Sequence, residues 1–229
     1  MLILHEILDN EAEQIAKTLS KVYRIPVHIQ KEDLSSWFKP LPQFNGYWDS
    51  SKKIAKKVDI ATPNNAVMIL TDRDLYYGNS SKDDEWIFGY CMGNVQVVSN
   101  ARMKGENSQP IKDLTVPYDK YMKRFETLAV HEVGHDVIND EHMKKAYWVN
   151  ASNDIKYPLG EHCTDNKCVM YEVVDILTPT ASQGYLLIGK EKKYDAGLDE
   201  HIVRLYDDWF CGNCKDSLMI PIEYANKVR

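Results

Sequence analysis

The chain has 229 residues, of which 44% are apolar and 27% are charged, and this composition excludes a disordered or collagen-like protein. With 34 acidic and 28 basic residues, the formal net charge is −6, which disfavours non-specific binding to nucleic acid. The first residues offer no apolar stretch long enough for a signal peptide, and no later run suits a membrane span, so we expect a cytoplasmic protein.

The first quarter of the chain predicts a β-α-β opening. An apolar run at residues 2–8 is typical of a strand, and residues 9–22 carry apolar side chains at helical spacing. Residues 24–30 alternate in the manner of a half-buried strand. We expect an ordered loop at residues 31–49 and a short basic helix at residues 51–58.

The middle of the chain predicts further strands and one long helix. The nearly continuous apolar run at residues 66–72 is typical of a strand that is covered on both faces. Residues 86–89 and 95–99 predict two shorter strands, and a helix is expected from Pro117, as its first residue, through about Ile138. The last third is expected to be loop-rich, with one helix at residues 198–209.

These elements predict a single α/β (α+β) domain spanning residues 1–229. Its N-terminal α/β part is expected at about residues 1–140, and a smaller C-terminal part at about residues 141–229. There is no internal repeat or low-complexity segment that would indicate a different organisation.

The long helix carries the sequence His131-Glu132-Val133-Gly134-His135. Two residues four positions apart on a helix are offset by about 40° and about 6 Å, so both imidazoles can bind one metal ion. Glu132 lies beside the pair and is placed to act as a general base on water at the metal. This motif predicts a catalytic zinc site.

Four of the five cysteines form two close pairs, Cys163 with Cys168 and Cys211 with Cys214. Two such pairs separated by a loop have the spacing of a tetrahedral structural zinc site. Disulfides are the competing interpretation, which a reducing compartment disfavours. Cys91 stands apart and is interpreted as a packing residue.

A tetrahedral catalytic zinc needs a third protein ligand, and two histidines compete for this position. On a continuing helix His142 would lie about 10.5 Å along the axis from His135, too far for a bond, so it can coordinate only if the chain turns. His162 follows Gly160, which permits a sharp turn, and directly precedes the first cysteine. We therefore favour His162 over His142.

Together these residues resemble the archaemetzincin family of zinc metallopeptidases, whose pattern is HExxHxxGxxHC, then x4-Cys-x-Met, then Cys-x-x-Cys. The matching segments are His131-Glu132-x-x-His135, His162-Cys163-x4-Cys168-x-Met170 and Cys211-x-x-Cys214. The likeness extends over nearly the whole chain. It implies a metzincin-like fold, with a twisted mixed sheet, an active-site helix and a smaller loop-rich C-terminal part around a four-cysteine zinc. It also implies that Met170 forms the methionine turn beneath the catalytic metal.

The chain departs from the family pattern in two places. Ile138 occupies the glycine position, and additional residues precede His162. The two expansions fall at about residues 143–160 and 172–205, where we expect them to lie beside the active-site cleft.

These assignments predict a zinc metallopeptidase with two zinc ions per chain, one catalytic and one structural, that acts on a peptide or protein substrate. Glu132 is expected to accept the proton of the zinc-activated water and to pass it to the leaving amine. Tyr171 beside Met170 is interpreted as a packing residue rather than an oxyanion donor.

The alternatives to a metallopeptidase are a catalytically silent, zinc-stabilised binding module and a zinc hydrolase that acts on non-peptide amides. A purely structural histidine site has no use for Glu132, so this carboxylate favours the enzyme.

Overall fold

The computed structural model describes residues 1–35, 46–47, 66–76, 86–138, 141–204 and 208–218. The helix expected at residues 51–58 and most of the loop expected at residues 31–49 lie outside this part of the chain. The chain divides into two compact units, the first containing Met1–Gly105 and Gln109–Asp136, and the second containing Glu106–Ser108 and Val137–Met219. Each unit is described in turn.

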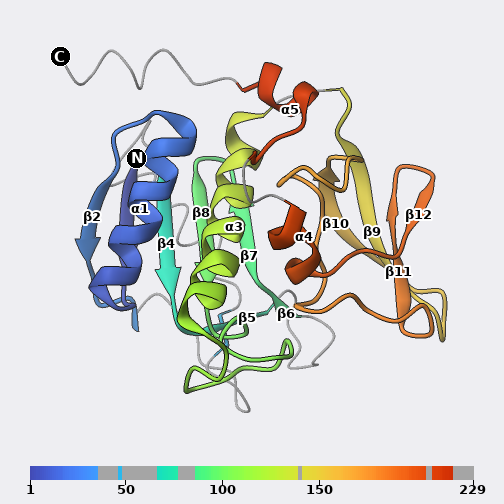
Figure 1. Cartoon of the computed structure of the whole chain (residues 1–229), viewed down its shortest axis with the longest axis horizontal. Helices are drawn as coiled ribbons and strands as arrows, with labels where there is room; N and C mark the ends of the chain where they lie inside the picture. Colours follow the sequence, from blue (N-terminus) through green and yellow to red (C-terminus); the bar gives the residue numbers. More distant parts are fainter. Residues whose placement is uncertain (36–45, 48–65, 77–85, 139–140, 205–207, 219–229) are drawn as a thin grey trace. The chain divides into compact units, whose positions relative to one another are not determined.

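The first unit contains a five-stranded mixed sheet in the order β2-β1-β4-β8-β7 (Figure 1). Its strands are β1 (Leu2–His5), β2 (His28–Lys31), β4 (Val67–Thr71), β7 (Gly89–Met92) and β8 (Val95–Ser99). All neighbours are parallel except β7, which pairs antiparallel with β8 and forms one edge of the sheet. Every residue of β4 and β8 is buried, as expected for central strands covered on both faces. The predicted β-α-β opening is confirmed, but β2 begins only at His28 and all four of its residues are exposed, so the expected half-buried strand at residues 24–30 is wrong in its bounds and burial.

Two helices, α1 (Asp9–Tyr23) and α3 (Tyr118–Val137), lie on the same face of this sheet (Figure 1). Both were expected within one or two residues of these bounds. Hydrogen bonds join the two helices. Gln14 Nε2 and Thr18 Oγ1 of α1 donate to Glu126 Oε1 of α3 at 3.1 and 2.8 Å. The Tyr23 hydroxyl also donates to the carbonyl oxygen of Val130, at 2.5 Å. These contacts hold the middle of α3 against α1.

Buried arginines secure the segment between β8 and α3. Arg124 of α3 donates from Nη1 to the carbonyl oxygens of Met103 and Gly105, at 2.8 and 2.6 Å. Arg102 forms a bidentate ion pair with Asp74, with both distances 2.7 Å, and its guanidinium stands 4.5 Å from the Trp86 ring centroid. Asp74 and Trp86 belong to a small sheet of β3 (Gly46–Tyr47), β5 (Asp74–Tyr76) and β6 (Trp86–Ile87).

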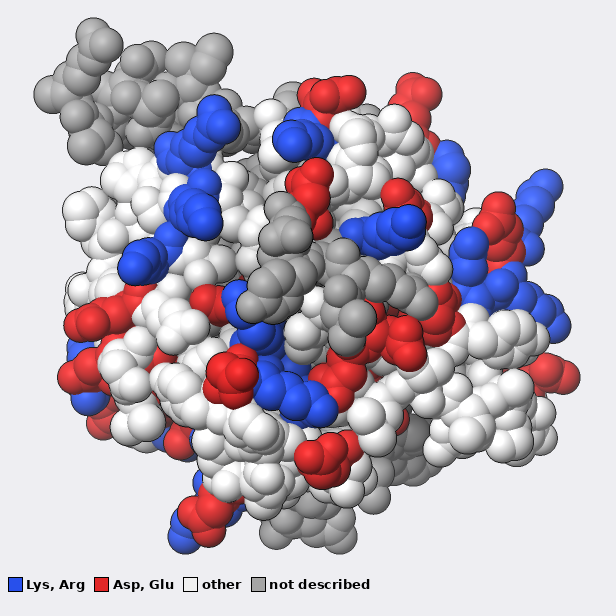
Figure 2. All heavy atoms as spheres, in the orientation of Figure 1, with Lys and Arg blue, Asp and Glu red and all other residues white. Residues whose placement is uncertain are grey.

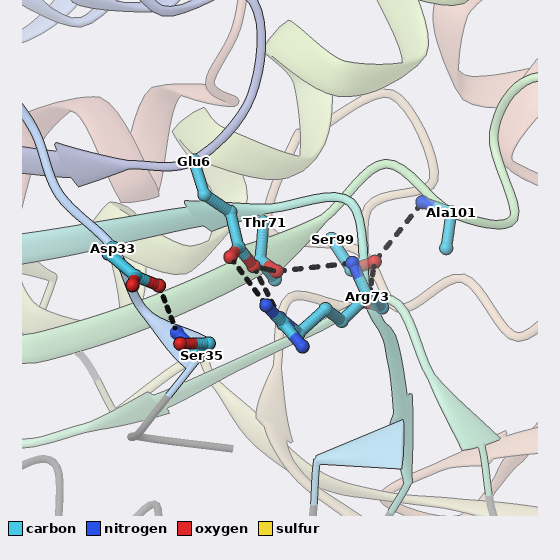
Figure 3. A network of polar contacts seen from close by, with 7 residues as sticks. All are labelled: Glu6, Asp33, Ser35, Thr71, Arg73, Ser99 and Ala101. Carbon is cyan, nitrogen blue, oxygen red and sulfur yellow. Dashed lines mark hydrogen bonds and ion pairs between the residues drawn. The ribbon is translucent and has the colours of Figure 1, made fainter. Parts of the chain in front are cut away.

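A polar network ties together the carboxyl ends of the parallel strands (Figure 3). Glu6, just after β1, accepts hydrogen bonds from Arg73 Nε at 2.8 Å and Nη2 at 3.0 Å, and a third from the Thr71 hydroxyl at the end of β4. The Ser99 hydroxyl at the end of β8 donates to the Arg73 carbonyl oxygen at 2.6 Å. Every charged group drawn there has a partner within the fold, so we assign the network a structural role.

The second unit contains a four-stranded antiparallel sheet in the order β10-β9-β11-β12. Its strands are β9 (Lys144–Asn150), β10 (Lys156–His162), β11 (Gly184–Ile188) and β12 (Glu191–Lys193). This region was expected to be loop-rich. The two expansions of the family pattern instead pair with each other, because β9 of the first joins β11 of the second. One sheet face is buried by a cluster of Ala146, Tyr171, Leu186, Ile188 and Ala196.

Two short helices follow this sheet. α4 (Leu198–Arg204) begins at the predicted residue, and residues 208–211 are not helical. α5 (Gly212–Asp216) begins after Cys211, whose sulfur accepts the backbone N–H of Cys214 at the start of the helix. Among the described residues, none of the helices combines the length and apolar character that a membrane crossing requires. Figure 2 shows acidic and basic side chains intermingled over the face that it presents.

Candidate metal centres

The histidine pair lies near the C-terminal end of α3, as predicted. His131 is buried, His135 is half-buried, and their Nε2 atoms are 3.1 Å apart. A tetrahedral zinc with Zn–N bonds of about 2.0 Å places two ligand nitrogens about 3.3 Å apart. The two rings therefore already have the separation that shared coordination of one zinc ion requires.

Glu132 lies beside this pair and is buried, with 5% of its surface exposed. Its carboxylate lies against the backbone of β7, because a Cβ atom at Gly89 would stand only 2.5 Å from Glu132 Oε1. Any larger residue at position 89 would therefore displace the Glu132 side chain from its observed position. No local sequence pattern indicates this contact, because it joins positions 43 residues apart.

Cys91 lies on the same strand and is half-buried. Burial raises the pKa of the Cys91 thiol, and the negative charges of Glu132 and Asp136 raise it further. A thiol with a raised pKa is a poor nucleophile, which agrees with the packing role expected for Cys91.

His162 ends β10 in the second unit and is almost fully buried. Its Nε2 lies 2.5 Å from Glu172 Oε2, and the Glu172 side chain is 13% exposed. A carboxylate hydrogen-bonded to one ring nitrogen fixes the orientation of a histidine. Histidines that bind a metal through the other nitrogen usually have such a partner. Glu172 is a functional candidate that the motifs do not include, although it lies only two residues after Met170.

The second unit brings cysteines together with a histidine. His142, Cys163, Cys211 and Cys214 each offer one donor atom, and these atoms all lie within 4.8 Å of one another. None of the five cysteines forms a disulfide. Cys168 is not part of this group, but its sulfur is hydrogen-bonded to those of Cys163 and Cys214. The structure thus gathers all four predicted cysteines and adds His142, which had been weighed as a ligand of the other metal.

Met170 and Tyr171 are buried in the turn that follows Cys168. The Met170 carbonyl oxygen accepts the backbone N–H of Cys163 at 2.8 Å, which closes the loop between the two cysteines. The Tyr171 hydroxyl donates to Asp195 Oδ1 at 2.8 Å, and the ring stacks near His201 at 5.1 Å between centroids. Tyr171 is therefore held as a core residue, as expected, and the special role of Met170 stays a prediction.

The predicted catalytic ligands are divided between the two units. His131, Glu132 and His135 belong to the first, and His162 belongs to the second. The histidine pair and the cysteine cluster are thus two candidate metal sites whose donors suit zinc. The assignment of His162 as third ligand stays a prediction.

No family model matches the sequence, and no curated protein matches it. Solved structures do match its fold, each with 18% sequence identity. An archaemetzincin from Archaeoglobus fulgidus, complexed with malonate, matches over 95% of this chain and 100% of its own, with a TM-score of 0.54. A zinc-dependent peptidase from Methanocorpusculum labreanum matches over 95% of this chain and 99% of its own, with a TM-score of 0.57. An archaemetzincin from Methanopyrus kandleri matches over 94% of this chain and 91% of its own, with a TM-score of 0.51. The chain therefore has the mixed α/β fold of the archaemetzincins, as its motifs predicted.

Proposed function

We propose that this chain is a zinc-dependent metallopeptidase of the archaemetzincin type. The observation that carries the proposal is the pair of Nε2 atoms 3.1 Å apart on α3, with the buried carboxylate of Glu132 between them in sequence. In the proposed site His131, His135 and His162 hold the ion, and each offers a ring nitrogen of the kind that zinc binds. The two solved archaemetzincin structures and the zinc-dependent peptidase structure support the assignment through their fold.

A zinc ion held by His131, His135 and His162 would act as a Lewis acid toward the scissile carbonyl and the attacking water. Glu132 accepts the proton of the attacking water and delivers it to the amine of the departing peptide. The β7 backbone at Gly89 limits the movement of this carboxylate on one side. The complete reaction consumes one water molecule, and Glu132 is again a carboxylate after it has given the proton to the amine.

Strand β7 offers a means of holding a peptide beside Glu132. Among the described strands β7 is an edge strand, with β8 on one side only. An extended peptide can add to such an edge through main-chain hydrogen bonds, and this mode of recognition depends little on side-chain identity. The scissile bond of a peptide bound along β7 would then pass next to Glu132.

The test compares the wild-type chain with Glu132→Gln on a mixture of casein-derived peptides, with the products read by mass spectrometry. We expect the variant to keep its zinc and lose hydrolysis, because only the proton acceptor changes. Asp119→Asn makes the same carboxyl-to-amide change at an exposed position in the first turn of α3 and should keep activity. A fully active Glu132→Gln would refute the role of Glu132. A zinc-loaded wild type that cleaves nothing would favour the silent binding module.

A further inference from the structure

The cysteine cluster contains more donor atoms than a tetrahedral ion can bind. A tetrahedral zinc with Zn–S bonds of about 2.3 Å and Zn–N bonds of about 2.0 Å has S···S edges of about 3.8 Å and S···N edges of about 3.5 Å. The Cys163 and Cys211 sulfurs are 3.7 Å apart, which matches the first value. His142 Nε2 lies 3.9 Å from the Cys211 sulfur and 3.1 Å from the Cys214 sulfur, on either side of the second value.

The surroundings of the sulfurs are those of thiolate ligands. The backbone N–H of Asp165 donates to the Cys163 sulfur at 3.3 Å, and that of Cys214 donates to the Cys211 sulfur at 3.5 Å. Such N–H groups stabilise negative charge on sulfur. Cys163 and Cys214 are fully buried, so thiolates at these two positions would be shielded from water and would need a cation to balance their charge.

His142 and Cys168 are the two candidates for the remaining position. His142 belongs to the group of donor atoms that lie within 4.8 Å of one another, and Cys168 does not. The Cys168 sulfur is hydrogen-bonded to those of Cys163 and Cys214 and accepts the backbone N–H groups of Met170 and Cys211. The four donor atoms of the shell that includes His142 are thus already mutually close, and Cys168 is engaged in hydrogen bonds beside them.

We propose that the second metal ion is bound by His142, Cys163, Cys211 and Cys214, and that Cys168 stays outside the coordination shell as a neighbouring thiol. This Cys3His shell differs in one ligand from the four-cysteine site that the family pattern implies. It also adds a third chain segment to the site. His142 lies between the end of α3 and the start of β9, so the ion links this connection to the turn at Cys163 and to α5.

The proposal is tested by 113Cd NMR of the full-length chain loaded with cadmium, because each bound ion gives its own resonance and the shift reports the number of sulfur ligands. For the cysteine cluster we expect a resonance upfield of the position typical of four sulfurs, with coupling to protons of one imidazole ring. A wild-type resonance at the four-sulfur position without imidazole coupling overturns the proposal. This readout does not depend on peptidase activity, so it stands apart from the proposed function.

Variants at the two competing positions sharpen the test. His142→Cys should move the resonance downfield to the four-sulfur position, because it creates four sulfurs around the ion. His142→Ala should weaken metal binding at this site at least tenfold, whereas Cys168→Ser should leave both the shift and the metal stoichiometry unchanged. The reverse result, with loss of the ion in Cys168→Ser and an unchanged shift in His142→Cys, assigns the fourth position to Cys168 and overturns the proposal.

Discussion

Gly89 and Glu132 are in such close contact that a larger residue at position 89 would displace the Glu132 carboxylate. A Cβ atom there would stand 2.5 Å from Glu132 Oε1 and 2.9 Å from Cδ. Real Cβ atoms do not approach so closely, so one of the two groups would have to move. Glu132 is a side chain and Gly89 is held in the β7–β8 ladder, so the carboxylate is the group that gives way.

We expect Gly89→Ala to reduce peptide hydrolysis by about 100-fold, because a misplacement of about 1 Å in a catalytic group has costs of this size. The zinc content should stay that of the wild type, since His131 and His135 are not touched. The measurements are kcat/KM on a peptide identified as a substrate and zinc content by atomic emission. Gly89→Ala with wild-type kcat/KM would show that Glu132 does not need its observed position.

The control for this prediction is Gly93→Ala, four residues further along the chain. A Cβ atom at Gly93 meets nothing within 4 Å, but the backbone there has φ +57°. Alanine in this left-handed conformation costs about 1 kcal/mol of stability. Gly93→Ala should therefore lower the melting temperature and keep kcat/KM, which separates backbone strain from displacement of Glu132.

Glu172 is predicted to control metal binding through His162. Replacing it by glutamine removes the charge that faces His162 Nε2 at 2.5 Å. Carboxylate partners of metal-binding histidines typically contribute 10- to 100-fold in affinity, so chelator competition should show a loss of about this size at the three-histidine site. Glu191→Gln is the control, because Glu191 is exposed and pairs with Lys193. Unchanged affinity in Glu172→Gln would argue against His162 as the third ligand.

The first unit was predictable because its signals are local. The buried run of β4 and the helical spacing of α1 and α3 are each contained in one stretch of sequence. β9 and β10 were not recognised, because they are rich in lysine, include a proline and a glycine, and bury only scattered residues. They are held by pairing with each other and by the pairing of β9 with β11, which begins 34 positions after the end of β9.

The candidate sites also contain one part that local sequence predicts and another part that depends on tertiary contacts. The i, i+4 spacing of His131 and His135 determines their proximity once the helix is recognised. The contact between His142 and Cys214 joins residues 72 positions apart. A sequence without its tertiary structure offers no means to place His142 beside Cys214. Helical extrapolation from His135 only indicated that His142 is too distant to share the metal of the histidine pair, and α3 in fact ends at Val137.

The ion pair between Arg102 and Asp74 is predicted to be important for the stability of the first unit. Both side chains are buried, with 2% and 6% exposed, so Asp74→Asn leaves a buried guanidinium without the charge that faces it. Breaking a buried pair in this way costs about 3 kcal/mol, which urea unfolding measures directly. The matched control is Asp9→Asn, because the Asp9–Lys31 pair is equally short at 2.8 Å but mostly exposed. We expect Asp9→Asn to change the free energy of unfolding little. An equal loss of stability in Asp9→Asn and Asp74→Asn would contradict the role of burial.

Glu11 of α1 is predicted to make stability depend on pH. Its side chain is 5% exposed, and this burial raises the pKa of Glu11 above the ordinary value of 4.5, although hydrogen bonding with Tyr121 partly opposes the shift. A raised pKa means that the folded state binds the proton more tightly, so ionisation of Glu11 destabilises the fold as the pH rises above that ordinary value. Glu11→Gln removes this contribution and should gain stability relative to wild type as the pH rises above 4.5, with the difference becoming constant above the folded-state pKa. Urea unfolding of both proteins across this range checks the prediction, with the exposed Glu13→Gln as the control for losing one charge from the same helix. A Glu11→Gln difference that does not change with pH would mean that Glu11 titrates alike in the folded and unfolded states.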